Sequence, residues 1–270
     1  MKNIGIRRVS NYGTSHPVVA RLRLQSLELI RWACLPVEKQ KRAIQIYDSL
    51  KNRLLKCHEC NVRLETAAKD ALSSSLGFAG ANVRPHLIGL EQEAETFLYE
   101  SKNYLRDLLG VFNVFFGTKF DEASDFCSNM GKGRRKVTEW ASERFGPKDR
   151  FTKMLQEEEP WIRELICKRN AVEHPRGKSG VLKIDNFQQM PDGRMAPPSW
   201  ARDQQPPTDV LGDLRIAMDN MLTLAEDILV ACIENTTDFP IEFTSIPEKE
   251  RSAACPIRIT VQMKKRDTVS

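Results

Sequence analysis

The chain has 270 residues, of which 41% are hydrophobic and 29% are charged, and its formal net charge is +5 at pH 7. These proportions are typical of an ordinary soluble globular protein, long enough for one large domain or for one domain with elaborations. The small positive charge permits an anionic partner such as RNA but does not require one.

The cysteines exclude a disulfide framework, because their number is odd and they are scattered along the chain. The seven lie at positions 34, 57, 60, 127, 167, 232 and 255, a distribution that fits a reducing compartment. Residues 1–13 contain no apolar stretch typical of a signal peptide, and the longest apolar run, residues 105–116, is too short to cross a membrane. We therefore expect a cytoplasmic protein with no membrane partner.

The N-terminal segment, residues 1–35, is predicted to form a loose arm followed by a helix. Residues 18–32 are compatible with either a helix or a partly alternating strand. We favour the helix because Pro17 suits its first position.

Two long helices are predicted next. Apolar residues recur at steps of three, four and seven from about Pro36 to Ser75 and form one continuous stripe: Ala43, Tyr47, Leu50, Leu54, Cys57, Leu64, Ala68 and Ala71, with Asn61 among them. Residues 77–85 interrupt this pattern, and a second helix follows from about Leu87 to Phe116. Two such helices favour an antiparallel hairpin that forms the spine of a bundle.

The second half of the chain predicts shorter elements. Residues 117–147 and 150–156 favour short helices, residues 181–187 a strand followed by a turn at Pro191-Asp192-Gly193, and residues 209–233 a helix that closes the bundle. Alternating apolar residues after position 240 favour two strands joined by a loop at residues 248–254.

The predicted fold is therefore an all-α helical bundle built on two long antiparallel helices. It carries a small β-hairpin excursion, the insert of residues 176–207, and a short C-terminal β-hairpin. The boundaries are residues 1–35 for the arm and first helix, 36–236 for the bundle, and 237–270 for the C-terminal hairpin and tail.

One predicted helix carries polar residues on its inward side. Pro160 suits the first position of this helix, and Pro175 disfavours helical geometry at His174. Arg169 and Asn170 each follow an apolar residue by four positions, and His174 follows Asn170 by four, so all three are expected on the buried stripe. Polar groups on such a stripe need partners or a function.

The sequence Arg169-Asn170-x3-His174 resembles the Arg-x4-6-His signature of the HEPN domain (higher eukaryotes and prokaryotes nucleotide-binding), and the likeness extends loosely over residues 88–235. The resemblance implies a helical bundle that forms a homodimer, with the motifs of two protomers facing across a cleft. Many members are metal-independent ribonucleases, and others are binding modules. Toxin–antitoxin or antiviral defence systems, with an antitoxin as protein partner, are common settings for the family.

If the family mechanism applies, His174 is the acid–base group, Arg169 binds the phosphate, and Asn170 orients the histidine or the phosphate. No metal or other cofactor is expected. Basic residues beside the motif and in a separate cluster are candidates for RNA binding: Lys168, Arg176, Lys178, Arg134 and Arg135.

Structural explanations of the same residues stay open. His174 could complement the helix dipole, Arg169 could pair with a buried glutamate, and Asn170 could bond a neighbouring backbone. The chain would then be a non-catalytic scaffold that binds a protein partner or a nucleotide, with the C-terminal strands as the docking element.

Two other features have competing interpretations. Cys57-x2-Cys60 could bind zinc, but no second pair with suitable spacing follows, and Cys57 lies on the apolar stripe, so buried thiols are favoured. Trp140, which follows the basic cluster, could stack on a base, but a core position is more common for such a residue.

Overall fold

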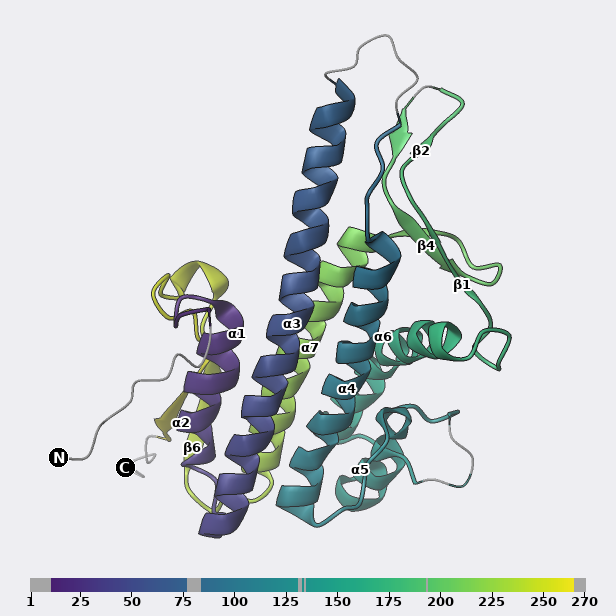
Figure 1. Ribbon diagram of the computed structural model, residues 1–270. Helices are drawn as coiled ribbons and strands as arrows, with labels where there is room; N and C mark the ends of the chain where they lie inside the picture. The colour runs from purple at the N-terminus through teal and green to yellow at the C-terminus, as the bar shows by residue number, and fades with distance from the viewer. Residues whose placement is uncertain (1–10, 77–83, 131–132, 134, 193, 265–270) are drawn as a thin grey trace, which may run out of the picture.

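The computed structural model describes residues 11–76, 84–130, 133, 135–192 and 194–264. Most of these residues are helical, as predicted (Figure 1). The helical elements are α1 (Pro17–Val19), η1 (Ala20–Gln25), α2 (Ser26–Ile30), α3 (Val37–Leu76), α4 (Leu90–Phe116), η2 (Ala123–Phe126), α5 (Val137–Phe145), α6 (Arg150–Glu173), α7 (Val210–Glu234) and η3 (Glu248–Glu250). In this part of the chain, no helix combines the length and the apolar character needed to cross a membrane.

The N-terminal segment is helical from Pro17 to Ile30, with Pro17 in its first turn as predicted. His16 caps this helix, since its Nδ1 accepts a hydrogen bond of 3.3 Å from the Val18 N–H. Its middle, η1, is a π-helix, which the sequence did not indicate.

Helices α3 and α4 run in opposite directions, because Arg53 in α3 pairs with Asp107 of α4 while Arg63, further along α3, pairs with the earlier Glu93 (Figure 1). The predicted apolar stripe of α3 is buried up to Ala68, in contact with α4, α7 and η1. Helix α4 begins at Leu90 and not at Leu87, because Gly89 adopts a left-handed conformation with a φ of 77°.

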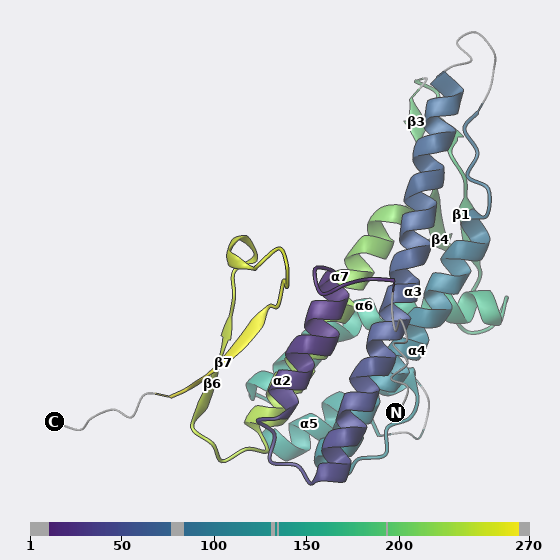
Figure 2. The same ribbon diagram turned by 60° about the vertical axis from the view of Figure 1, so that its left-hand side comes forward.

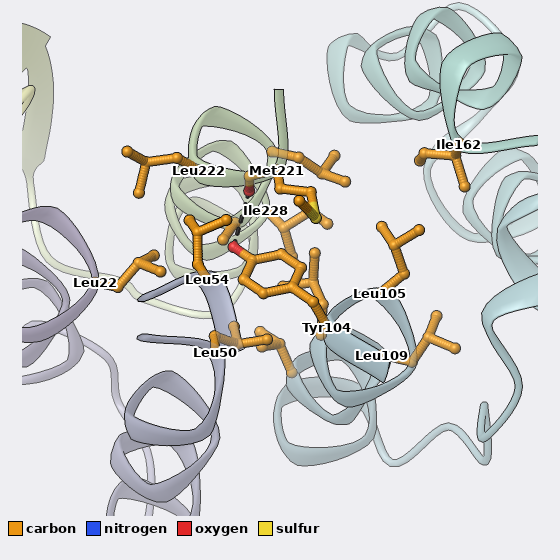
Figure 3. Close-up of a cluster of buried hydrophobic side chains, with 14 of the residues drawn as sticks. Leu22, Leu50, Leu54, Tyr104, Leu105, Leu109, Ile162, Met221, Leu222 and Ile228 are labelled. Atoms are coloured by element: carbon orange, nitrogen blue, oxygen red, sulfur yellow. Dashed lines mark hydrogen bonds between the residues drawn. The ribbon is translucent and has the colours of Figure 1, made fainter. Parts of the chain in front are cut away.

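Helix α7 closes the bundle over the α3–α4 pair, as predicted, and Asp209 caps its start. Two fully buried tyrosines attach it: the Tyr47 hydroxyl donates to the Ala225 carbonyl at 2.7 Å, and the Tyr104 hydroxyl donates to the Met221 carbonyl at 2.8 Å. Figure 3 shows the second bond within the apolar core between the three helices.

Helix α6 corrects one prediction. It begins at Arg150, capped by Asp149, and continues through Pro160, which the sequence had placed at the start of a separate helix. Proline in a helix interior removes one backbone hydrogen bond. Leu155 and Ile162, on either side of Pro160, are both buried, and their contacts offset that loss.

The insert between α6 and α7 forms two small antiparallel sheets where one hairpin was expected. The strands are β1 (Leu182–Asp185), β4 (Ser199–Arg202) and β5 (Thr208–Asp209), in the order β1-β4-β5, and the pair β2 (Gln188–Gln189) and β3 (Met195–Ala196). Pro191 and Asp192 lie in the turn between β2 and β3, and Gly193 is outside the described residues. The insert contacts α6 through β1 and α7 through β5.

The C-terminal strands β6 (Ile241–Ser245) and β7 (Ile259–Met263) pair antiparallel, with Phe243 opposite Val261. The hairpin lies beside the N-terminal helices (Figure 2). Arg258, just before β7, helps to attach it: the Arg258 N–H donates to the Gln25 side-chain oxygen at 2.7 Å, and the Arg258 guanidinium binds Glu226 of α7 at 2.6 Å.

Candidate functional site

The motif lies at the C-terminal end of α6, where this helix packs against α4. The Arg169 guanidinium pairs with Glu173 one turn later and lies 5.6 Å from the centre of the Tyr99 ring on α4. Asn170 accepts a hydrogen bond of 2.8 Å from Lys102, also on α4. Only 13% of the Arg169 side chain is exposed. Arg169 therefore has the inward position that was predicted for the motif residues.

His174 does not share that position. The helical conformation ends at this residue, with φ −127° and ψ 69°, because the following proline disfavours helical geometry. The imidazole therefore turns into solvent, with 70% of the side chain exposed, and its Nε2 lies 3.3 Å from Glu173 Oε2. The predicted buried stripe of Arg169, Asn170 and His174 is thus wrong for His174.

A groove lies between the two helices at this point, and we call it the α4–α6 groove. Its lining residues are Glu95, Thr96, Leu98, Tyr99, Arg169, Val172 and Glu173. Burial lowers the pKa of Lys102, and the neighbouring charge of Arg169 lowers it further; burial also lowers the pKa of Arg169. Two cations that are partly removed from water and close together favour a nearby anion, and the Glu173 carboxylate is such an anion for Arg169.

The other predicted RNA-binding residues do not line this groove. Lys168 is buried, since its ammonium lies 3.1 Å from Asp213 and 4.4 Å from the centre of the Trp200 ring, so it is not available to a surface phosphate. Arg176 and Lys178 are exposed in the turn after His174. Arg135 is exposed and pairs with Glu143 near α5. Arg134 lies outside the described residues.

Three groups at the site were missed by the sequence reasoning: Tyr99, Lys102 and Glu173. The first two are three positions apart, which places them on the same face of α4. An aromatic ring on a polar helix face, here 53% exposed, was the signal that could have drawn attention to them. Glu173 lies within the motif itself, between Asn170 and His174, but its contact with both Arg169 and His174 depends on the end of the helix.

The competing sequence features belong to the core. Cys57 and Cys60 are buried between α3 and α4, and burial raises the pKa of each thiol to about 12. Within the described ranges, no three His, Cys, Asp or Glu side chains are grouped so that they could hold a metal ion. Trp140 is buried against Phe112, Phe116 and Phe145, so its ring is not available to stack on a base.

Comparisons of the chain with protein-family models, with curated proteins and with solved structures found no match. The α4–α6 groove is therefore the feature from which a function can be inferred. Two adjacent cations can bind one phosphate group, and an exposed imidazole such as that of His174 is the type of group that serves in proton transfer.

Proposed function

We propose that the protein is a metal-independent endoribonuclease of the HEPN type that cleaves RNA in a cleft between two protomers. The observation that supports this most directly is the proximity of two partly buried cations: Lys102, which binds Asn170, and Arg169, which precedes Asn170 in the chain. In this proposal both cations bind the phosphate and stabilise the charge that develops on it.

The reaction requires two proton transfers. A base takes the proton from the ribose 2′-hydroxyl, the 2′-oxygen forms a bond to phosphorus, and the bond to the 5′-oxygen breaks as an acid protonates that oxygen. The products are a 2′,3′-cyclic phosphate and a 5′-hydroxyl. One imidazole cannot reach both oxygens at once, so we propose that each protomer supplies its own His174. Glu173 Oε2, 3.3 Å from Nε2, orients the ring.

A non-catalytic scaffold that binds a protein partner or a nucleotide is the second candidate. The pair between Arg169 and Glu173 supports it, because this pair satisfies the guanidinium within α6 and needs no ligand. For either candidate, the family resemblance suggests a cytoplasmic toxin–antitoxin or antiviral defence system with an antitoxin or another protein as partner.

Cleavage of a mixed-sequence RNA in EDTA separates the two candidates. The parent protein, His174→Ala and Arg169→Ala are compared at matched circular dichroism and matched oligomeric state. His86→Ala is the control, since His86 is another exposed histidine, remote in sequence from the motif. Cleavage by the parent and the control only, with 2′,3′-cyclic phosphate ends, supports the nuclease. No cleavage by any of the four, with a stable dimer throughout, supports the scaffold.

A further inference from the structure

A second cavity, of about 460 Å³, lies between α6, α7 and the insert, and we call it the insert pocket. Its volume is within the range of small-molecule sites. It shares no lining residue with the α4–α6 groove. The insert pocket is therefore a cavity distinct from the α4–α6 groove.

The back wall of the insert pocket is held in place by buried polar contacts. Trp200 on β4 is 2% exposed, and its indole N–H donates to Asp213 Oδ2 at 2.6 Å. The same oxygen accepts hydrogen bonds from the Thr208 hydroxyl at 2.6 Å and from the Lys168 ammonium at 3.1 Å. Because three donors converge on one oxygen, the wall is formed before any ligand arrives.

The other oxygen of Asp213, Oδ1, accepts no hydrogen bond from any residue in the described ranges. Burial raises the pKa of Asp213, but the hydrogen bonds from Thr208 and Trp200 and the charge of Lys168 lower it by more, so the pKa lies below its ordinary value. The group is thus an ionised carboxylate at neutral pH. An ionised oxygen on the wall of a pocket is a strong acceptor without a donor.

The remaining walls are mostly apolar and have no net charge. Charges on the wall are paired, Lys168 with Asp213 and Arg202 with Glu164 at 3.1 Å, so the wall has no excess charge that would select a phosphate. Arg202 Nε is a buried donor without a hydrogen-bond partner among the described residues. Its apolar wall is formed by Phe97, Trp161, Leu165, Ala217 and Ile216, the last of which is 61% exposed and lies at the rim.

We infer that the insert pocket binds a small, flat, uncharged aromatic molecule that carries an N–H or O–H donor. The ring lies along the apolar wall, where aromatic faces stack well. The donor binds Asp213 Oδ1, and it fixes the orientation of the ring.

Indole and indene test this inference, because they have the same shape and only indole has an N–H. Each is titrated into the full chain, and the indole N–H resonance of Trp200 is followed by ¹H–¹⁵N correlation NMR after assignment with Trp200→Phe. Ile216→Arg places a long side chain at the rim of the pocket. Ile88→Arg is the matched control, since Ile88 is 86% exposed and does not line the pocket.

We expect saturable indole binding to the parent and to Ile88→Arg. Indene should bind the parent roughly tenfold more weakly, because it lacks the hydrogen bond. Ile216→Arg should show no saturable indole binding. Equal affinity for indole and indene would remove the role of Asp213 Oδ1. Equal indole binding by Ile216→Arg, or no saturable shift of the Trp200 resonance in the parent, would overturn the site. None of these outcomes depends on RNA cleavage.

Discussion

Lys102 on α4 donates a hydrogen bond of 2.8 Å to Asn170 Oδ1 on α6, and this bond joins the motif helix to the spine of the bundle. Asn170 therefore orients a cation from another helix and does not orient His174, which lies in solvent. The motif residues thus contribute unequally: two are held against α4, whereas the imidazole of the third contacts its neighbour Glu173 and is otherwise exposed.

Lys102→Gln should weaken RNA binding. A plot of log affinity against log salt concentration has a negative slope. If the lysine contacts one phosphate, this slope should become less steep by about 0.7 for a single-stranded RNA. Fluorescence anisotropy with a labelled oligonucleotide over a series of salt concentrations measures this slope. Lys39→Gln, at an exposed position on α3, is the control. An unchanged slope for Lys102→Gln would count against a phosphate contact.

Glu173→Gln should change binding and cleavage in opposite directions. The variant removes the carboxylate that pairs with Arg169, so RNA affinity should increase. Cleavage should decrease, because the glutamate no longer orients the His174 ring. Anisotropy and single-turnover cleavage measure the two effects separately. Parallel changes in both would contradict the role we assign to Glu173.

Glu226→Gln should destabilise the fold. Glu226 is buried and binds Arg21 and Arg258. Neutralising it leaves the buried Arg21 guanidinium without its counter-charge and leaves Arg258 paired with Asp227 alone. Removing one partner of a buried ion pair typically costs about 3–5 kcal/mol. Urea unfolding measures the difference. The control, Glu234→Gln at an exposed position of the same helix, should stay within about 0.5 kcal/mol of the parent.

His16 should make stability depend on pH. Burial, followed by the charge of the nearby His58, lowers the pKa of His16 to about 4, whereas an unfolded chain has the ordinary value near 6.5. Between these values the unfolded state binds more protons, so stability is full above pH 6.5 and is lost as the pH falls toward 4. Protonation also removes the acceptor for the Val18 N–H.

Urea unfolding at several pH values checks this dependence. His16→Gln should reduce the slope of the unfolding free energy against pH between pH 4 and pH 6.5. Part of the slope that remains should come from His58, whose pKa is also lowered by burial. His86→Gln, at an exposed position, should retain the full slope. If His16→Gln and the parent have the same slope, the cap does not titrate as described.

The thiols should react at very different rates in the native protein. Cys34 is exposed, whereas Cys57 and Cys60 are buried with pKa values of about 12, so few of their thiolates exist at pH 8. A disulfide reagent that releases a coloured thiol should give a fast phase that Cys34→Ser abolishes. Fast reaction of Cys57 or Cys60 would show that α3 and α4 separate readily.

The sequence was most informative where one period repeats over a long stretch. The apolar stripe of α3 predicted its buried face up to Ala68, because packing is decided by residues three and four positions apart. Pro160 was misleading for the opposite reason. Its effect on the backbone is local, whereas the contacts that carry α6 past it come from residues distant in sequence.

The site was predicted less completely than the fold. The positions of Arg169 and Asn170 follow from helical spacing, but Lys102 is 68 positions before Asn170, and no local pattern links the two. Lys168 was assigned to RNA by its place next to the motif. One step along a helix turns a side chain by about 100°, and this rotation directs Lys168 to Asp213 and the insert pocket.

The two buried tyrosine hydroxyls also restrict how the molecule can change shape. Tyr47 and Tyr104 come from different helices and bind carbonyls one turn apart on α7. A slide or rotation of α7 would leave both phenols without acceptors inside the core, which costs about 1–3 kcal/mol for each. Any motion that accompanies ligand or partner binding should therefore leave α3, α4 and α7 as one rigid unit and occur in the parts attached to its outside.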